Sequence, residues 1–468
     1  MQDRVSANPG RVLITPESGG AYYATIERAD NPSVIGTALN KASLLTDTTA
    51  ADYGLDSTAT PNDALQALKT NRRPWRVGDI LETKRTDLGN KWVLCNGAQI
   101  SSSNYPDLYD MTEFTINGNW NNYSSSQIQV LNDITSNDEY YVACGSRSNY
   151  PWILYSSDGT TWTPLQLSTS KKVSLTGICW TGTYFVACGH IGDKSAGTIY
   201  PYIYYATNPA GPWTEKQIST AREGSLTAKV RYVNGYIVVC GLKGYSSLHQ
   251  TSPASRPIIL YARNPTSTFT EKEIASIGSD HGHFYIVSIA YGNSKYVVCA
   301  NGSGDGRRYI FYASSLSGTW TSVNPSGESV LRPADIIYSS SLSRFLCLDC
   351  GEGGVNILYS TNGTSWNIAS VSSGFASPNL GGITYFDGKF YVCCTRNSAL
   401  LYSSSSYSGP WEEKQLKEGS AYATGILEKD SMITVCGYES SVANIWRKGK
   451  TLPIISVDSA YAYIKAKE

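Results

Sequence analysis

The sequence predicts a mainly β protein built around a seven-bladed β-propeller. One apolar strand pattern that contains a cysteine returns along the chain, for example as YYVACG (140–145), YFVACG (184–189) and YIVVCG (236–241). The seven recurring cysteines are Cys144, Cys188, Cys240, Cys299, Cys350, Cys394 and Cys436. Successive members lie 44, 52, 59, 51, 44 and 42 residues apart, and a period of roughly 40–50 residues is typical of propellers.

Each repeat contains enough short strands for one blade. In the second unit, SLTGICW (Ser174–Trp180), YFVACG and YIYYAT (Tyr202–Thr207) are strand-like, and TEKQI follows the turn NPAGPW. These runs are rich in β-branched and aromatic residues, and Gly, Pro and Asn bound them. Four strands in each unit is the composition of a propeller blade.

The turn between the third and fourth strands also repeats, and an aromatic residue follows it. That aromatic residue is expected to pack between neighbouring blades. The turns run over Tyr155–Trp162, Tyr205–Trp213, Tyr261–Phe269, Tyr312–Trp320, Tyr359–Trp366 and Tyr402–Trp411.

Two of these turns resemble the Asp-box of sialidase-like propellers. SSDGTTW (Ser156–Trp162) is one residue shorter than that box, and STNGTSW (Ser360–Trp366) has Asn362 in place of the aspartate. In that family the box is a structural turn away from the catalytic site. The resemblance therefore implies the fold and carries no information about catalysis.

The seven units span residues 113–449, and the seventh lacks the aromatic turn and a fourth strand. The strand-like EFTING (Glu113–Gly118) stands just before the first unit. It is expected to supply the missing strand, because pairing the two ends of the ring removes exposed sheet edges.

Composition excludes several classes of protein. Lys+Arg and Asp+Glu are equal at 38 each, which argues against a nucleic-acid-binding protein. No apolar run approaches a membrane span, and the N-terminal MQDRVSANPGRV lacks the apolar region of a secretory signal. The 11 cysteines are an odd number, and most occupy one repeated strand position. They are expected to be small buried side chains in a protein made in a reducing cytoplasm.

The first 70 residues differ in character from the repeats. Two short strand-like runs precede a helix-like stretch over Asn40–Tyr53. The following TPNDALQALK predicts a helix with Thr60 as its N-cap and Pro61 as its first helical residue. The segment DRVSANPGRVLITP…RADNPSVIGTALNKASLL resembles the N-terminal segment of tail-fibre or baseplate-attached proteins of phages from Gram-positive hosts. A small α+β tail-attachment segment is therefore expected at residues 1–74.

A second resemblance follows at Gly78–Met111, which is similar to the phage tail-collar motif. The residues that match are Trp92, Asn96, Gly97, Tyr105, Pro106 and Leu108. That module often ends in a Leu-Pro strand and a YIK strand, which stand here at Thr451–Glu468, beyond the repeats. The resemblance implies that the propeller (113–449) is inserted into a small collar-like domain formed by residues 75–112 and 450–468.

Together these resemblances imply a phage tail fibre or receptor-binding protein located in the virion tail and assembled in the bacterial cytoplasm. Its N-terminus would bind other tail or baseplate proteins, and its propeller would bind a host surface polysaccharide. A homotrimer is expected, with no nucleic acid, no membrane insertion and no cofactor. A tail-like bacteriocin or an injection particle would use the same part.

The candidate binding residues lie in the variable loops between second and third strands, because variable loops on a rigid scaffold often bind ligands. Aromatic and cationic side chains gather in units two to four, and they suit a sugar polymer, neutral or anionic. These residues are Lys194, Tyr200, Lys243, Tyr245, His249, Arg256, Arg307 and Arg308. The alternative that these are ordinary solvated loops stays open.

Two other functions stay open beside a receptor-binding protein without enzymatic activity. A tail-associated glycan hydrolase needs paired carboxylates, but Asp305, Asp335 and Glu352 stand on different units without a pairing signal. A purely structural baseplate component needs no ligand. A metal site is not expected, because Cys347 and Cys350 form a single CxxC pair and His281-x-His283 reads as a solvated loop.

Overall fold

The computed structural model describes most of the repeat region and short pieces of its flanks. The described residues are 11–14, 22–25, 80–83, 92–95, 104–105, 108, 114–169, 171–193, 198–219, 225–243, 256–274, 284–302, 309–323, 325, 332–351, 354–373, 381–450 and 461–465. The chain divides into two compact units, Met1–Asp79 with Glu468, and Ile80–Lys467.

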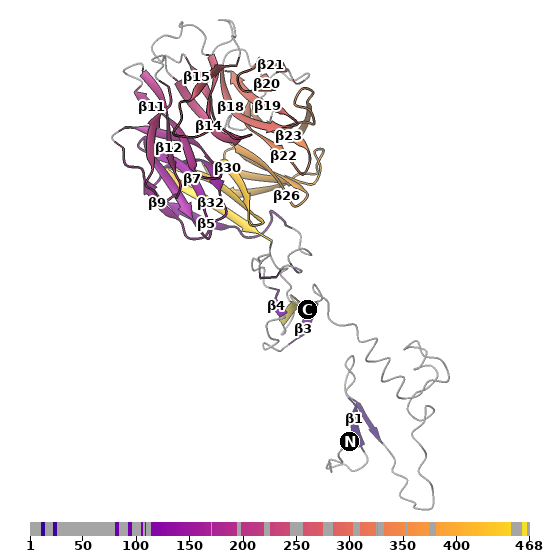
Figure 1. Cartoon of the computed structure of the whole chain (residues 1–468). Coiled ribbons are helices and arrows are strands. Elements are labelled where there is room, and N and C mark those ends of the chain that lie inside the picture. The colour runs from indigo at the N-terminus through magenta and orange to yellow at the C-terminus, as the bar shows by residue number, and fades with distance from the viewer. Residues whose placement is uncertain are drawn as a thin grey trace, which may run out of the picture. The chain divides into compact units, whose positions relative to one another are not determined.

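Seven four-stranded antiparallel sheets confirm the predicted propeller (Figure 1). In each blade the first strand of the repeat is innermost. These strands are β6 (Val130–Ser136), β10 (Val173–Trp180), β14 (Ser225–Val233), β18 (Phe284–Gly292), β22 (Pro333–Ser339), β26 (Gly381–Phe386) and β30 (Ala421–Lys429). Each innermost strand contacts that of the next blade and β30 contacts β6, so the strands form a closed ring.

The second strands carry the recurring cysteines. They are β7 (Tyr141–Arg147), β11 (Phe185–Asp193), β15 (Tyr236–Lys243), β19 (Lys295–Gly302), β23 (Arg344–Gly351), β27 (Lys389–Thr395) and β31 (Met432–Glu439). All eleven cysteines of the chain are buried, as the sequence predicts, and none of them is in a disulfide.

The register corrects two members of the cysteine repeat. In blade 1, Cys144 pairs with Asp133 of the innermost strand, and the same position in blade 5 pairs Asp335 with Leu348. Blade 5 therefore has leucine where Cys350 was predicted, and blade 6 uses Cys393, which pairs with Gly382. The runs CLDCG and YVCCT each contain two cysteines, so sequence spacing alone left the register open by one or two residues.

The third strand of each blade is largely buried, and the fourth strand is polar and exposed. The third strands are β8 (Tyr150–Ser156), β12 (Thr198–Ala206), β16 (Arg256–Ala262), β20 (Tyr309–Ala313), β24 (Gly354–Ser360), β28 (Ala399–Ser404) and β32 (Val442–Gly449). The fourth strands are β9 (Thr163–Gln166), β13 (Thr214–Gln217), β17 (Thr270–Glu273), β21 (Thr321–Val323), β25 (Asn367–Ser373) and β29 (Glu412–Lys417). Several of these edges are short and carry Lys and Glu, as in TEKQ and TEKE, which discourages pairing with another chain.

The ring closes through a strand from the N-terminal side of the repeats, but that strand is not the predicted one. β5 (Asn121–Ser125) pairs antiparallel with β32 as the fourth strand of blade 7, with Tyr123 opposite Ile445. The described part of the predicted segment, residues 114–118, is not a strand. Its Phe114 and Ile116 are buried between blades 6 and 7 instead. The closing strand NNYSS is an exposed edge, so it needs few of the apolar residues that mark a strand in a sequence.

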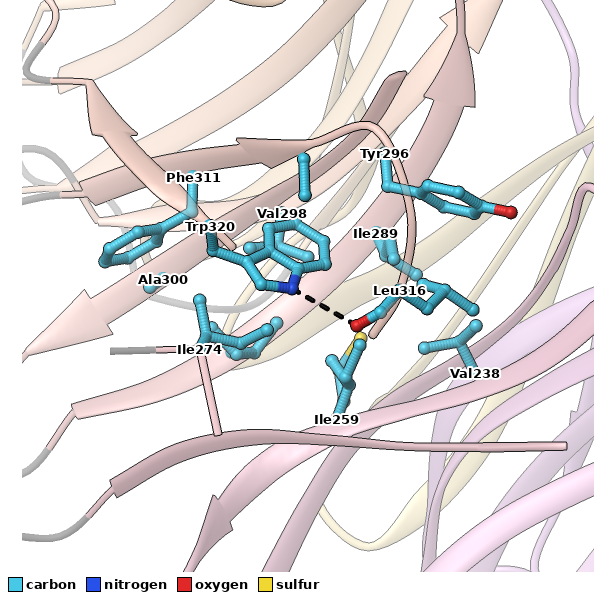
Figure 2. Close-up of a cluster of buried hydrophobic side chains, with 13 residues drawn as sticks. Val238, Ile259, Ile274, Ile289, Tyr296, Val298, Ala300, Phe311, Leu316 and Trp320 are labelled. Carbon is cyan, nitrogen blue, oxygen red and sulfur yellow. Dashed lines mark hydrogen bonds between the residues drawn. The ribbon is translucent and has the colours of Figure 1, made fainter. Parts of the chain in front are cut away.

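The core consists of seven apolar clusters, one at each interface between neighbouring blades. Figure 2 shows the cluster between blades 3 and 4, where Val238 and Ile259 meet Val298 and Phe311. Trp320, the aromatic residue after the turn between the third and fourth strands of blade 4, packs in this cluster. The predicted position of these aromatic residues is confirmed throughout, because each one packs against the preceding blade.

The two Asp-box-like turns share one hydrogen-bond pattern. Asp158 Oδ1 accepts the backbone N–H groups of Thr160 and Thr161 at 2.7 Å each, and Ser156 Oγ accepts that of Gly159 at 2.8 Å. Trp162 Nε1 donates to the Gly159 carbonyl at 3.1 Å. The turn thus orders its own backbone and directs the tryptophan into the interblade cluster.

Outside the blades, a three-stranded sheet joins the two ends of the sequence around the propeller. β33 (Tyr461–Lys465) lies between β3 (Ile80–Thr83) and β4 (Trp92–Leu94), antiparallel to both. In the other compact unit, β1 (Arg11–Ile14) pairs with β2 (Tyr22–Thr25). The predicted N-terminal helices lie outside the described residues.

Candidate functional site

The blade ends define two faces of the ring. Because the four strands of a blade are antiparallel, the start of the innermost strand lies at the same end as the hairpin between the second and third strands. This end is called the hairpin face, and the opposite end, with the other turns of each blade, is called the turn face. All predicted binding residues belong to the hairpins that open on the hairpin face of blades 2, 3 and 4.

The structure brings two of the predicted residues together. Lys243 of β15 and Arg256 of β16 are register partners at the base of the blade 3 hairpin. Tyr200 lies at the corresponding end of β12 in blade 2, where it packs half-buried against the cluster of blades 1 and 2. The other five candidates, Lys194, Tyr245, His249, Arg307 and Arg308, lie outside the residues whose contacts the structure describes.

Two glutamates that the sequence reasoning missed complete this part of the face. Lys243 Nζ lies 2.7 Å from Glu271 Oε1, and Arg256 lies 3.4 Å from Glu273 Oε2. The four side chains are between 27% and 53% exposed. Exposed ion pairs of this kind are weak and exchange partners readily. The alternating TEKE of β17 was the sequence signal, because it places both glutamates on one face of an edge strand.

The centre of the ring holds a cluster of four charged residues, of which three are buried and Arg231 is half-buried. Arg231 of β14 binds two carboxylates, Asp133 of β6 at 2.7 Å and Asp335 of β22 at 3.1 Å. Lys229, also of β14, lies 3.0 Å from Asp335. The cluster joins blades 1, 3 and 5, and its formal charges cancel. Sequence reasoning named Asp335 but found no partner for it. Asp305 and Glu352 lie outside the described residues.

Electrostatics keep Asp335 and Lys229 ionised. Burial raises the pKa of Asp335, but Arg231 and Lys229 outweigh burial and hold that pKa below its usual value. Burial lowers the pKa of Lys229, but Asp335 and Asp133 outweigh it and raise that pKa above the usual value. Asp335 is therefore a paired carboxylate and is poorly suited to donate a proton as a general acid.

A belt of aromatic residues lies on the turn face, and the sequence reasoning missed it. Five consecutive blades have an aromatic residue at the same position near the end of the innermost strand, opposite the start of the second strand. All five are half-buried or exposed. They are Trp180, Tyr232, Tyr291, Tyr338 and Tyr385. The sequence signal was an aromatic residue at the last or next-to-last position before the turn that joins the first and second strands of each repeat.

No metal or membrane element is found in the described part of the chain. Cys347 packs between blades 4 and 5 whereas Cys350 packs between blades 5 and 6, so the CxxC pair is divided between two cores. Among the described residues, no group of three or more His, Cys, Asp or Glu is placed to hold a metal ion. Those residues include no helix of the length and apolarity that crossing a membrane requires. His281 and His283 lie outside them.

Comparison with known proteins places the fold. No protein-family model and no curated protein sequence matches the chain. Among solved structures, YCF48 bound to D1 peptide is similar with a TM-score of 0.50 and 12% identity, over 72% of this chain and 97% of that chain. This likeness supports the propeller fold and, at such low identity, nothing beyond it.

Two carbohydrate-active proteins are more distant neighbours. A sialidase of Trypanosoma rangeli, solved with 2,3-difluorosialic acid, has a TM-score of 0.43 and 11% identity, over 70% of this chain and 59% of that chain. The polysaccharide lyase PL25 ulvan lyase, bound to -[GlcA(1-4)Rha3S]-, has a TM-score of 0.48 and 12% identity, over 68% of this chain and 91% of that chain.

Proposed function

We propose that this chain is a non-catalytic glycan-binding protein whose propeller holds a surface polysaccharide on its hairpin face. The observation that carries the proposal is the pair of exposed ion pairs, Lys243–Glu271 and Arg256–Glu273, at the base of the longest hairpin. Both cations and carboxylates can exchange these weak pairings for sugar hydroxyl or carboxylate groups. Tyr200, Tyr245, His249, Lys194, Arg307 and Arg308 would extend the same surface over blades 2 to 4.

We further propose that the protein is a phage tail fibre or receptor-binding protein, attached to the tail by residues 1–74. The collar-like sequence motifs at residues 75–112 and 450–468 support this proposal. The antiparallel pairing of β33 with β3 and β4 is consistent with one collar-like domain that the propeller interrupts. Host attachment by a homotrimer would gain affinity from many weak sites on one particle.

The test measures binding and sugar release in the same tube. The full chain is incubated with cells and cell-wall polysaccharides of candidate Gram-positive hosts. We expect saturable binding without release of sugar. The double variant K243A/R256A should weaken that binding, as should Y245A and R307A.

A matched control uses an ion pair of similar exposure between blades 6 and 7. Lys417 lies 3.4 Å from Glu439, and the two side chains are 42% and 29% exposed. K417A removes one exposed hairpin-face cation far from blades 2 to 4 and should leave binding unchanged. Equal loss in K417A and K243A/R256A would contradict the assignment to blade 3, and no binding on any host would favour a structural baseplate role.

A glycan hydrolase is the second candidate, because two carboxylates, Asp133 and Asp335, converge on one arginine at the centre of the ring. In this alternative Asp335, which is held ionised, would serve as the nucleophile or base, and another group would be the proton donor. If this reading holds, the wild-type chain releases sugars, and D133N or D335N abolishes release while the variants still bind the polymer. Binding without release by the wild-type chain would rule against this alternative on the glycans tested.

A further inference from the structure

A cavity lies on the turn face where the ring closes, between the last blade and the first. It has a volume of about 170 Å³, which corresponds to the room of about five or six water molecules. The closing strand β5 contributes Asn122 and Tyr123, the Asp-box-like turn of blade 1 contributes Thr160 and Trp162, and β32 contributes Arg447. Aromatic rings, amides and a hydroxyl therefore surround a space large enough for one sugar ring.

Arg447 is buried in this wall without a counter-ion. The residue is only 6% exposed. Its two terminal nitrogens donate to the Asp158 carbonyl at 2.8 Å and to the Tyr141 hydroxyl at 2.7 Å, and its Cζ lies 4.8 Å from the centre of the Tyr141 ring. Arg447 Nε has no hydrogen-bond partner.

All of these partners are uncharged. Across the described ranges, no carboxylate lies within ion-pair distance of Arg447. Asp430 reaches it only through Tyr141, whose hydroxyl donates to Asp430 Oδ2 at 3.0 Å. Burying an arginine without a directly paired anion is costly. A ligand carboxylate in the cavity would offset that cost.

We propose that this cavity binds the carboxylate-bearing ring of an acidic sugar. Arg447 supplies the charge that selects the carboxylate. Tyr123 and Trp162 supply apolar surface for the ring, and the side chains of Asn122 and Thr160 supply hydrogen bonds at the rim. The inference shares with the proposed function only the class of ligand, because the cavity and the hairpin-face residues lie at opposite ends of the blades.

The glycine at the back of the cavity fits this arrangement. Gly159 has a φ of +70°, and a Cβ there would lie 2.4 Å from Arg447 Cζ. Any other residue would displace the guanidinium. The backbone of the Asp-box-like turn therefore both fixes Trp162 and leaves space for Arg447.

The test uses the full chain with two monosaccharides, glucuronate and glucose. We expect saturation-transfer NMR and calorimetric titration to show glucuronate binding at least about tenfold tighter than glucose, since only the acid pairs with the guanidinium. R447Q should abolish that preference. Because R447Q also removes two buried hydrogen bonds, a rim variant provides the decisive comparison.

The rim variant is N122D, which adds a negative charge at an exposed position of the cavity. It should weaken glucuronate binding about tenfold through repulsion between like charges. The matched control is N264D, in the exposed turn of blade 3, where the side-chain oxygen accepts the Thr266 N–H at 3.0 Å and an aspartate keeps that acceptor. N264D should leave the glucuronate affinity unchanged.

Three results would overturn the proposal. They are no glucuronate binding at 50 mM (about the weakest affinity worth assigning to a site), equal affinities for glucose and glucuronate, or equal affinities in N122D and N264D. The two sites are separable, because K243A/R256A should no longer bind cells and polysaccharide but should still bind glucuronate. If the full chain binds no host glycan while glucuronate binding still depends on Asn122, the proposed function fails and the cavity assignment stands.

Discussion

At the scale of single residues, the same turn is stabilised by a charged side chain in blade 1 and by a neutral one in blade 5. Asp158 in blade 1 and Asn362 in blade 5 each accept two backbone N–H groups, at 2.7 Å and 2.9 Å respectively. Burial raises the pKa of Asp158, but the N–H groups of Thr161 and Thr160 outweigh it and hold that pKa well below its usual value. The aspartate therefore makes charge-assisted hydrogen bonds that the asparagine cannot.

This difference predicts a pH-dependent stability. D158N should keep the turn, as Asn362 does, and lower the stability by less than about 1 kcal/mol at neutral pH, because the carboxylate is exposed. Since the folded-state pKa is depressed, the extra stability of the wild type is present above the unfolded pKa of about 4. It is lost as the pH falls through the folded pKa. Thermal unfolding at intervals from pH 7 to pH 3 measures the gap between the two proteins.

The control for this prediction is D158A, which removes the single oxygen, Oδ1, that accepts both backbone N–H groups. It should cost about 1 kcal/mol, as loss of a helix cap does, and part of that cost should persist at low pH. A gap between wild type and D158N that stays constant down to pH 3 would contradict the charge-assisted reading of this turn.

Single residues also show where sequence reasoning reached its limit. The aromatic residues after the turns were located correctly, because each is one unambiguous large side chain at a fixed distance from turn residues. Cys350 and Cys394 were misplaced, because neighbouring small apolar residues fit the same strand pattern in two registers. Glu271 and Glu273 were missed as partners of Lys243 and Arg256, because a charged edge strand reads as solvated surface until the register is known.

At the scale of elements, strand patterns with an apolar face were predictable and the polar closing strand was not. β10 (Val173–Trp180) lies within one residue of its predicted range, since its alternation and turn residues agree. β5 has the sequence NNYSS and is held by pairing with β32 and by the interblade position of Tyr123. The partners in β32 are more than 300 positions away in the sequence, so no local signal marks the strand.

The segment before β5, residues 114–118, was predicted as the closing strand but packs between blades 6 and 7, and this packing can be tested. Phe114 is 1% exposed and meets Tyr391 edge-on at 5.3 Å and Phe386 at 6.1 Å. F114A should therefore lower the free energy of unfolding by about 3–5 kcal/mol, through lost burial and a cavity between blades 6 and 7. Chemical denaturation of the full chain measures the change.

The comparison for F114A is Y232A in the aromatic belt. Tyr232 is 41% exposed, so its truncation should cost under about 1 kcal/mol. If F114A were as mild as Y232A, residues 114–118 would be a loosely attached leader and not part of the core that closes the ring.

At the scale of the whole molecule, the seven interblade cores and the central cluster play different parts. Each apolar cluster links two neighbours only, whereas the cluster of Asp133, Lys229, Arg231 and Asp335 links blades 1, 3 and 5 across the axis. The seven-fold repeat predicted the ring itself. It did not predict the cluster, because Asp133, Lys229 and Asp335 break the repeat at a position where other blades have glycine or serine, as at Gly177 and Ser288, and Arg231 stands where blade 2 has Cys179.

The charge balance of this cluster predicts a specific pattern of stability. K229M leaves one net negative charge at the centre of the ring and D335N leaves one net positive charge, and each should cost about 3–5 kcal/mol, as for other broken buried ion pairs. The double variant K229M/D335N restores neutrality, and Arg231 keeps Asp133 as its partner at 2.7 Å. The double variant should therefore be less destabilised than the sum of the two single variants, by about 1–3 kcal/mol.

Denaturation of the four proteins, followed by circular dichroism and by tryptophan fluorescence, measures this coupling energy. Because the cluster spans non-adjacent blades, both signals should shift together in every variant. Additive losses, or a shift confined to one signal, would mean that each blade is stabilised by its neighbours alone and that the central charges contribute no coupling across the ring.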